Sequence, residues 1–474
     1  MVFSSITFLY YFLPIVLILY FVSPTIAIKN GVLLVSSLFF YGWGEPMYLF
    51  LMVATILVDY LCGLVIGRSE SALCRRITLI FSVVFSLGVL AYFKYADFFI
   101  DNFNTVTGLS IPLLKIALPV GISFYTFQTM SYVIDVYRRD VEVQRNPLTL
   151  GMYITMFPQL IAGPIVRYSD IVGELNKRKH SFENISYGIT RFVMGLSKKV
   201  LIADTMASLC DKFRASDEKS VLFYWMYAVA FSLQIYFDFS GYSDMAIGMG
   251  RAFGFNFPEN FNYPYISKSI TEFWRRWHMT LGTWFRDYLY IPLGGNRVKL
   301  LRWIFNILVV WMATGFWHGA AWNFILWGLM FALLLLIEKP FLTKQKQRGE
   351  KGSIGGRIFS HVYVLFLVMI SFVLFNAVDL KGAGVDILSL FGYGGIPAVS
   401  TASLYYLGSY AFVFIIAIIG ATPIPKIVYN KLCGNGVVKG IFSVAEPVVL
   451  LALLLAVTAH LVDGSFSPFL YFRF

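Results

Sequence analysis

Histidines are the side chains of this sequence best suited to proton transfer near neutral pH, and one of the five lies inside an apolar run. His318 occurs in ATGFWHGAAWNFILWGLMF, directly after Trp317 and before the small residue Gly319. An ionisable group at membrane depth is costly, usually faces a cavity, and marks function by default. A neutral imidazole can act as a general base. It can equally be a structural hydrogen-bonding group, and the residue alone leaves both interpretations open.

A second histidine, His278, lies in a segment rich in arginine and aromatic residues, FWRRWHMTLGTWFRDYLYIPLGGN. If this segment is helical, Arg275, Met279 and Arg286 share one face. Together with Arg276, they would form a basic surface suited to phosphate groups. Those phosphates could belong to lipid headgroups or to an anionic cofactor, and the charges favour neither source.

The other ionisable candidates have simpler interpretations. We expect His180, which follows NKRK, to be a solvated loop residue, and we expect His361 and His460 to lie near helix ends at the membrane interface. Asp238 ends an apolar run and Asp59 lies within one; each can pair with a buried cation or hydrogen bond at a helix end.

Motifs of several enzyme classes are missing from the sequence. GxSxG, Walker A, HExxH and CxxC do not occur, so a serine hydrolase, an ATPase or a zinc enzyme has no support, and no metal site is expected. The four cysteines are scattered and predict no disulfide framework. The glycines of GMGRAFG follow no strand and therefore predict tight helix packing rather than a phosphate loop.

The elements that position these residues must be membrane helices. Of the 474 residues, 58% are hydrophobic and 14% charged, with a mean hydropathy of +0.71. An average soluble domain has roughly 45–50% apolar and about 25% charged residues. The sequence therefore predicts one polytopic membrane domain spanning 1–474. The net charge of +12 lies in short clusters between apolar runs, which is typical of cytoplasmic loops and does not indicate nucleic-acid binding.

Hydropathy predicts an all-α bundle with about 11 crossings, because a span needs about 20 apolar residues. The N-terminal run has no basic region or cleavage site and is expected to be a retained span. Residues 240–300 are too rich in charge, glycine and proline for a plain span and are expected to form short amphipathic or re-entrant helices. The apolar runs are 5–22, 31–43, 46–66, 77–97, 116–136, 150–166, 185–203, 220–237, 302–316, 320–337, 357–377, 403–420 and 441–462.

The basic loops predict the orientation. The segments 339–357, 68–76 and 136–145 are rich in lysine and arginine and should face the cytoplasm. Counting outward from the 339–357 loop places the aromatic tail, residues 463–474, on the extracytoplasmic side.

Several long motifs resemble the membrane-bound O-acyltransferase (MBOAT) family. They are LPVGISFYTFQTMSYVIDVYR, MFPQLIAGPIVRY, YFDFSGYSDMAIGMGRAFGFNFPENFNYPY, the His278 segment, and WHGAAWNFILWG beginning at Trp317. Together they cover residues 118–337. The sequence is most similar to the bacterial branch that O-acetylates alginate and peptidoglycan (AlgI- and PatA-like), which is related to the D-alanyl transfer protein DltB.

The resemblance implies a helical bundle with a central tunnel, in which His318 is catalytic and His278 supports it from the cytoplasmic entry. Acetyl-CoA would be the donor substrate, with no permanently bound cofactor, and its phosphates would meet the basic 275–297 region. Trp317, Asn323 and Asp238 would line the donor path, with Asn323 a possible hydrogen-bond donor to the thioester oxyanion. The protein would lie in a bacterial cytoplasmic membrane.

The resemblance also suggests a role for the C-terminal SPFLYFRF, which is similar to the aromatic motif of a small partner peptide of DltB. Tyr471 would then carry acetyl to a secreted SGNH-type acetyltransferase, which would pass it to an extracytoplasmic polysaccharide. The alternative is an aromatic anchor at the membrane interface. Two other functions are weighed against O-acetylation: D-alanyl transfer to teichoic acid, and a non-catalytic transport or export subunit, because transport paths also carry buried histidine and arginine.

Overall fold

The computed structural model describes the backbone of residues 1–348 and 353–463 and the side chains of residues 1–341 and 353–463. Within these ranges every regular element is a helix, which confirms the predicted all-α class. Eight described helices are long and apolar enough to cross a membrane, so the chain is a multi-pass membrane protein. They are Pro46–Arg68, Ala72–Thr107, Val221–Ala252, Leu300–His318, Trp322–Phe341, Ile354–Phe375, Thr401–Gly420 and Gly436–Val462.

The predicted count of about 11 crossings exceeds these eight helices because some apolar runs do not form one long helix. Two further apolar helices, Phe8–Val22 and Ile26–Gly42, are shorter. The apolar run 150–166 does not form one helix: α6 ends at Thr155, the backbone turns at Met156, and Pro158 lies in the first turn of the four-residue α7. Proline has no N–H to continue the preceding helix and disfavours helical geometry in the residue before it, so a new helix starts there.

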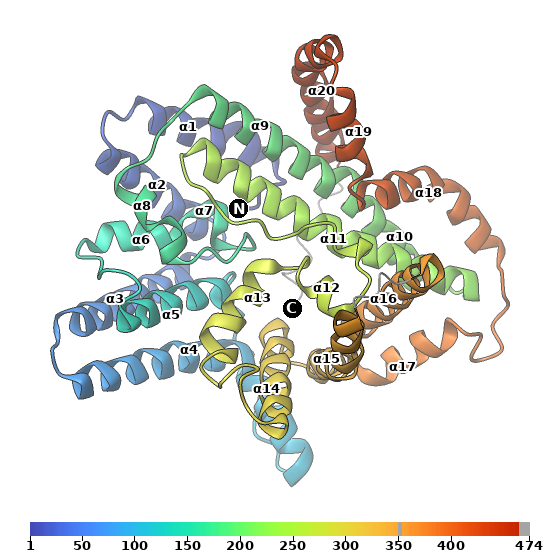
Figure 1. Cartoon of the computed structure of the whole chain (residues 1–474), viewed down its shortest axis with the longest axis horizontal. Coiled ribbons are helices and arrows are strands. Elements are labelled where there is room, and N and C mark those ends of the chain that lie inside the picture. Colours follow the sequence, from blue (N-terminus) through green and yellow to red (C-terminus); the bar gives the residue numbers. More distant parts are fainter. Residues whose placement is uncertain (349–352, 464–474) are drawn as a thin grey trace. The chain divides into compact units, whose positions relative to one another are not determined.

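The chain forms two compact units, unit 1 with residues 1–192 and 242–259 and unit 2 with residues 193–241 and 260–474. In unit 1, α3, α4 and α5 pack against one another (Figure 1). The buried Asp59 of α3 accepts hydrogen bonds from Ser82 and Ser86 of α4, at 2.6 and 3.1 Å, so two hydroxyl groups of a neighbouring helix satisfy this carboxyl group. The helices that lie wholly in unit 1 are η1 Phe8–Phe12, α1 Leu13–Val22, α2 Ile26–Gly42, α3 Pro46–Arg68, α4 Ala72–Thr107, α5 Ile122–Arg138, α6 Pro147–Thr155, α7 Phe157–Leu160 and α8 Tyr168–Asn176.

Helices α9, Phe182–Ser197, and α11, Val221–Ala252, each contribute residues to both units. Within unit 1 they cross where a Cβ added to Gly248 would lie 2.6 Å from the carbonyl oxygen of Gly188. Only glycine permits that approach, so the tight packing predicted for GMGRAFG is confirmed. Nearby, Arg191 bridges Asp244 at 2.8 Å and Glu259 at 2.5 Å.

The expectation that His180 is a solvated loop residue is wrong. Its Nε2 lies 2.9 Å from the hydroxyl of Tyr20, which donates to the carbonyl oxygen of Phe253. The buried Arg178 donates its Nε–H to the same hydroxyl. The basic run NKRKH is therefore held in unit 1 by the contacts of Arg178 and His180 with Tyr20, near the end of α1.

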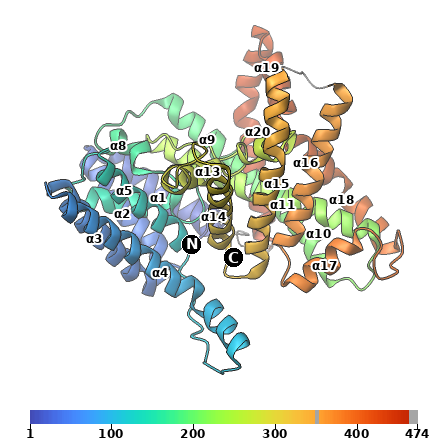
Figure 2. The ribbon, with the colours of Figure 1, turned by 60° about the horizontal axis from the view of Figure 1, so that its bottom comes forward.

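Unit 2 is built around the helical hairpin of α14 and α15 (Figure 2). A Cβ added to Gly315 of α14 would lie 2.3 Å from the carbonyl oxygen of Phe324, and one on Gly328 of α15 would lie 2.3 Å from that of Trp311. The two backbones therefore touch at these glycines, as in other small-residue membrane crossings. The helices that lie wholly in unit 2 are η2 Lys198–Ala203, α10 Asp204–Ala215, η3 Pro264–Ile266, α12 Ile270–Trp274, α13 Met279–Phe285, η4 Arg286–Tyr290, α14 Leu300–His318, α15 Trp322–Arg348, α16 Ile354–Phe375, α17 Leu380–Ser389, α18 Thr401–Gly420, α19 Ile424–Leu432 and α20 Gly436–Val462.

Helix α11 differs from the segmentation expected for the middle of the chain. It does not end near Asp238 but continues to Ala252, so only residues beyond 252 form the short helices predicted for 240–300. In its apolar window 78% of residues are buried, against 6% in α20. The polar residues of α11 would be unfavourable in contact with lipid, but here they are packed against protein, and this packing stabilises the helix. Helix α15 likewise continues to Arg348, so the predicted loop 339–357 is shorter than expected.

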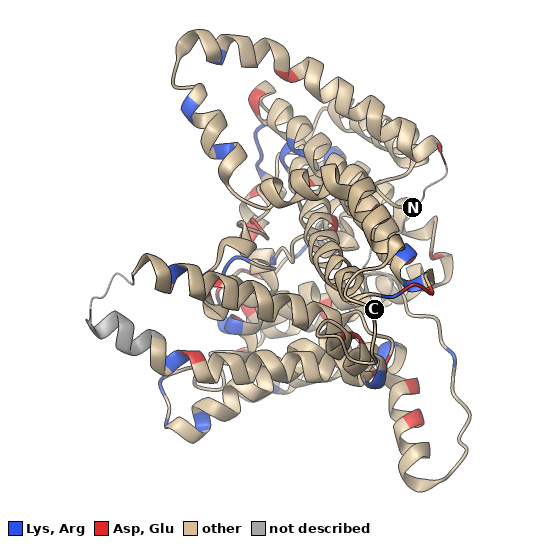
Figure 3. Cartoon of the chain, turned by 90° about the vertical axis from the view of Figure 1, so that its right-hand side faces the viewer, with Lys and Arg blue, Asp and Glu red and all other residues tan. Residues whose placement is uncertain are grey.

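Charged residues are sparse along the helices. Figure 3 shows that most of the ribbon carries neither sign of charge. Within unit 2 one exception is a buried cluster in which Lys199 of η2 pairs with Asp204 at 2.6 Å and with Asp238 of α11 at 2.8 Å. All three side chains are at most 6% exposed, so these charges are compensated inside the protein and not by solvent.

Candidate active site

The turn between α12 and α13 positions His278. The residue precedes α13 with φ 44° and ψ 53°, a left-handed conformation that non-glycine residues seldom adopt. Two backbone hydrogen bonds hold the turn against the preceding segment: Met279 N–H donates to Asn260 O, and Asn262 N–H donates to Arg276 O. At the other end, Glu338 of α15 accepts the N–H of Ile270, which fixes the start of α12. Such a locally unfavourable backbone persists only where its surroundings hold it, and it is often found at functional sites.

Asn260 determines which nitrogen of His278 carries the proton. Its buried Oδ1 accepts the backbone N–H of Thr280 at 3.2 Å and the Thr280 hydroxyl at 2.9 Å, and it lies 3.1 Å from His278 Nδ1. A backbone N–H can only donate, so this side-chain atom of Asn260 must be the oxygen. The Nδ1 of His278 is then the donor, and its Nε2 carries the lone pair.

The imidazole of His278 is neutral at physiological pH. The side chain is 2% exposed, and burial lowers its pKa to about 3; it lies outside the eight apolar helices. The Nε2 is buried and has no hydrogen-bond partner in the described part of the protein. A buried acceptor without a partner is costly, so this atom is a candidate contact for a substrate or a water molecule.

Trp317 lies in ring contact with both candidate histidines. Its ring centroid is 6.0 Å from that of His278 and 5.1 Å from that of His318, the last residue of α14. His318 is 6% exposed and makes edge-to-face contacts with Trp327 of α15 and Phe375 of α16, at 5.1 and 5.3 Å. The two histidines that lie 40 positions apart in the sequence are therefore held around one indole ring.

The oxyanion role expected for Asn323 is wrong. Its Nδ2 donates to the carbonyl oxygens of Phe375 at 3.2 Å and Ala377 at 3.1 Å. Both partners only accept, so the amide nitrogen must face them, and the group left without a partner among the described residues is the buried acceptor Oδ1. Asn323 instead joins the start of α15 to the end of α16.

Trp327 was not singled out from the sequence beyond its place in the WHGAAWNFILWG motif, yet it offers a hydrogen-bond donor beside His318. The side chain is 2% exposed, and its indole Nε1–H is buried without a partner in the described residues. An indole nitrogen can only donate, so it can bind developing negative charge. Asn260 was missed as well, because its effect on His278 depends on a contact across 18 positions.

The arginines do not form the single basic face predicted. The helix breaks at 275–278, so Arg275, Met279 and Arg286 do not share one face. Arg276 is occupied by Glu272, at 2.9 Å, and by the carbonyl oxygen of Asn262. Arg275 and Arg286 are exposed, and Arg286 pairs with Asp287 at 2.7 Å.

Asp238 is ion-paired with Lys199, as described above, which makes it part of a structural charge cluster. His361, expected at an interface, is half-buried, and its Nδ1 lies 3.1 Å from the carbonyl oxygen of Ser267. Tyr471 lies outside the described residues.

The buried pair of histidines thus lies inside an all-α multi-pass membrane protein. The chain belongs to the membrane-bound O-acyltransferase family, whose family model matches residues 143–375. That match includes His278, Trp317 and His318. The chain is therefore an acyltransferase.

Three curated relatives show which acyl-transfer reactions are found among proteins similar to this chain. The chain is 40% identical to a protein of Azotobacter vinelandii described as "Probable alginate O-acetylase AlgI", and the alignment covers 100% of both chains. It is 34% identical to the peptidoglycan O-acetyltransferase of Helicobacter pylori, over 84% of this chain and 81% of that one. It is 33% identical to the teichoic acid D-alanyltransferase of Bacillus subtilis, over 46% of this chain and 58% of that one.

Proposed function

We propose that the protein transfers acetyl from cytoplasmic acetyl-CoA toward an extracytoplasmic polysaccharide, with an SGNH-type secreted partner completing the transfer. The single observation that carries the chemistry is the pair of buried histidines around Trp317. The substrate class is supported by the alignment with an alginate O-acetylase along the full chain. Membership of an acyltransferase family favours an enzyme over the transport or export subunit that the sequence also allowed.

His318 acts as the general base in this proposal. It takes the proton of the acceptor hydroxyl while the hydroxyl oxygen attacks the thioester carbonyl carbon. The carbon–sulfur bond then breaks, an ester forms, and the imidazolium returns the proton to the CoA thiolate. His278 stays neutral and accepts a hydrogen bond at Nε2, and the Trp327 indole N–H donates to the carbonyl oxygen as it gains charge.

The donor phosphates meet Arg275 and Arg286, which are exposed, while Arg276 serves the α12–α13 turn. In this proposal Tyr471 is the acyl relay on the acceptor side. A phenol there would accept acetyl from the site and pass it to the secreted partner. Replacement of Tyr471 by phenylalanine keeps the aromatic anchor and removes the hydroxyl, so it separates the two roles.

The test uses the purified full-length protein and acetyl-CoA labelled in the acetyl group. We expect His318→Ala to abolish acetyl transfer or hydrolysis, because it removes the proposed general base. His278 contacts Trp317, but among the described residues only His318 has an imidazole in contact with both Trp317 and Trp327. The matched control is His460→Gln in α20, which also removes one imidazole and should leave activity unchanged. Full activity in His318→Ala would refute the assignment.

D-alanyl transfer is the second candidate, and the observation that favours it is the alignment with the Bacillus subtilis teichoic acid D-alanyltransferase. That alignment covers less than half of this chain, whereas the alginate O-acetylase aligns along its whole length. Incubating the protein with acetyl-CoA and, separately, with a D-alanyl carrier-protein thioester decides between the two donors.

A further inference from the structure

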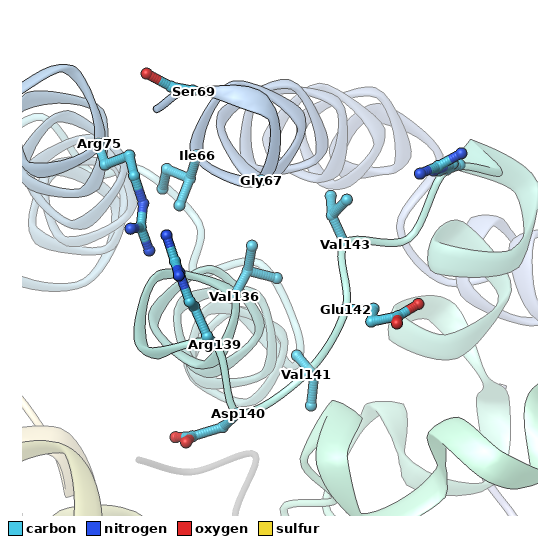
Figure 4. Close-up of a pocket in the computed structure, with 11 residues that line it drawn as sticks. Ile66, Gly67, Ser69, Arg75, Val136, Arg139, Asp140, Val141, Glu142 and Val143 are labelled. Carbon is cyan, nitrogen blue, oxygen red and sulfur yellow. The ribbon is translucent and has the colours of Figure 1, made fainter. Parts of the chain in front are cut away.

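A cavity of about 450 Å³ opens in unit 1 at the end of α3, the start of α4 and the segment that follows α5 (Figure 4). Arg75 donates from Nη2 to the carbonyl oxygen of Tyr137 at 2.6 Å, so the two basic connections 68–76 and 136–145 meet here. Both were predicted to face the cytoplasm, and their contact is consistent with a shared side. The lining residues are Ile66, Gly67, Ser69, Arg75, Val136, Arg139, Asp140, Val141, Glu142, Val143 and Arg145.

Two guanidinium groups converge in this cavity. Figure 4 shows the side chains of Arg75 and Arg139 pointing toward each other, while those of Asp140 and Glu142 point away from them. Among the described residues, neither arginine forms an ion pair with a carboxylate. The Nε of Arg75 is buried and has no hydrogen-bond partner in the part of the chain that the structure describes. Arg139 is exposed, whereas Arg75 is half-buried and keeps an unused buried donor beside it. An anion between the two guanidinium groups would relieve their repulsion and take up this donor.

The backbone aims Arg139 into the cavity at a conformational cost. Helix α5 ends in a Schellman motif, in which Asp140 N–H donates to Asp135 O and Arg139 N–H donates to Val136 O. The residue at the Arg139 position has φ 64°, where glycine is preferred. An arginine there costs local stability, and strained residues of this kind often occur at binding sites.

We propose that this cavity binds a phosphate group, carried either by a phospholipid headgroup or by a soluble phosphate ester. Arg75 and Arg139 bind its oxygens, because guanidinium groups match phosphate with paired hydrogen bonds. Ile66, Val136 and Val143 supply an apolar wall for the group attached to it. The volume is within the range of about 300–1,000 Å³ found for small-molecule sites. The proposal uses no residue of the histidine site and is independent of the proposed function.

The experiment measures two probes on the full-length protein. In one arm, native mass spectrometry of the detergent-solubilised protein follows binding of phosphatidylglycerol, with phosphatidylcholine as the uncharged comparison. In the other, inorganic pyrophosphate is titrated and thermal stabilisation is recorded. Arg139→Gly is the main variant because glycine suits φ 64° and should preserve or raise the melting temperature. Arg76→Gln is the matched control, since it removes a neighbouring exposed charge that does not line the cavity.

We expect Arg139→Gly to weaken binding at least five-fold in one arm, and Arg75→Gln to do the same, while Arg76→Gln behaves as the wild type. Loss confined to the lipid arm identifies a headgroup, and loss confined to the pyrophosphate arm identifies a soluble phosphate ester. If Arg75→Gln does not fold, the folded Arg139→Gly variant still decides. Equal binding by Arg139→Gly and Arg76→Gln in both arms overturns the proposal.

Discussion

Replacing Gly315 by alanine tests whether the crossing of α14 and α15 sets the position of the histidine site. Gly315 lies one helical turn before His318, and α15 carries Trp327, which contacts His318. The crossing thus fixes two of the groups that the proposed chemistry needs. A change at the crossing should reach the site without altering any residue that touches substrate.

The expected displacement follows from the contact distance. A Cβ on Gly315 would lie 2.3 Å from the carbonyl oxygen of Phe324, whereas ordinary contact begins at 3.4 Å. The obstacle is backbone and cannot rotate away, so α14 and α15 must separate locally by about 1 Å. A misplacement of that size costs about 10²-fold in rate. The lost close packing should also lower the melting temperature.

The assay is acetyl transfer from labelled acetyl-CoA by purified Gly315→Ala, together with its melting temperature and gel-filtration profile. The matched control is Gly408→Ala in α18, where an added Cβ meets nothing within 4 Å. Alanine there should leave activity unchanged and stabilise the helix by up to about 1 kcal/mol.

The result that would refute this reasoning is a Gly315→Ala variant with wild-type activity and stability. If the variant is unstable but its folded fraction transfers acetyl at the wild-type rate, the crossing stabilises the fold without positioning the site. If it is folded and slow, the positioning role is confirmed.

Two further predictions concern buried charge. Because burial lowers the pKa of His278 to about 3, the unfolded chain binds more protons than the folded one between about pH 3 and pH 6.5. The free energy of unfolding therefore falls as the pH is lowered, by about 2 kcal/mol at pH 5. His278→Gln should reduce this dependence of the melting temperature on pH, and an unchanged slope would contradict the assigned neutral state. Lys199→Met should lower the free energy of unfolding by about 3–5 kcal/mol, because it leaves the buried carboxylates of Asp204 and Asp238 uncompensated. Lys198→Met, one residue away and half-buried, is the control, and equal melting temperatures for the two variants would contradict the cluster's role.

Hydropathy predicted the class of the protein well but its segmentation less well. Long runs such as α3, α16 and α20 are apolar along their whole length and were located within a few residues. The run 150–166 is also apolar, yet Pro158 divides it. In the opposite direction, α11 continues through GYSDMAIGMGRA because its polar residues are buried against protein. Hydropathy measures transfer into lipid. It has no term for the way proline interrupts a helix or for polar residues that are buried against protein, so it placed these two boundaries incorrectly.

The sequence located groups that are recognised by residue type, but it could not give the direction in which a side chain points. His278, Trp317 and His318 were singled out by type and motif, and the structure brings their rings together. Asn323 was given a donor's role, but its N–H groups face backbone carbonyl oxygens. A sequence names an amide but does not say which way it points.

The sequence by itself determined that this chain is an all-α membrane protein, that it belongs to an acyltransferase family, and that His318 is costly to bury. These follow from composition, hydropathy and ordered motifs, all of which are local properties. Only the tertiary structure decided that Asn260 fixes the tautomer of His278, that Trp327 presents an unused donor beside His318, and that Arg75 and Arg139 converge in one cavity. Hydrogen bonds and like-charge contacts act over a few ångströms, so they depend on which distant segments meet, and that is determined by packing.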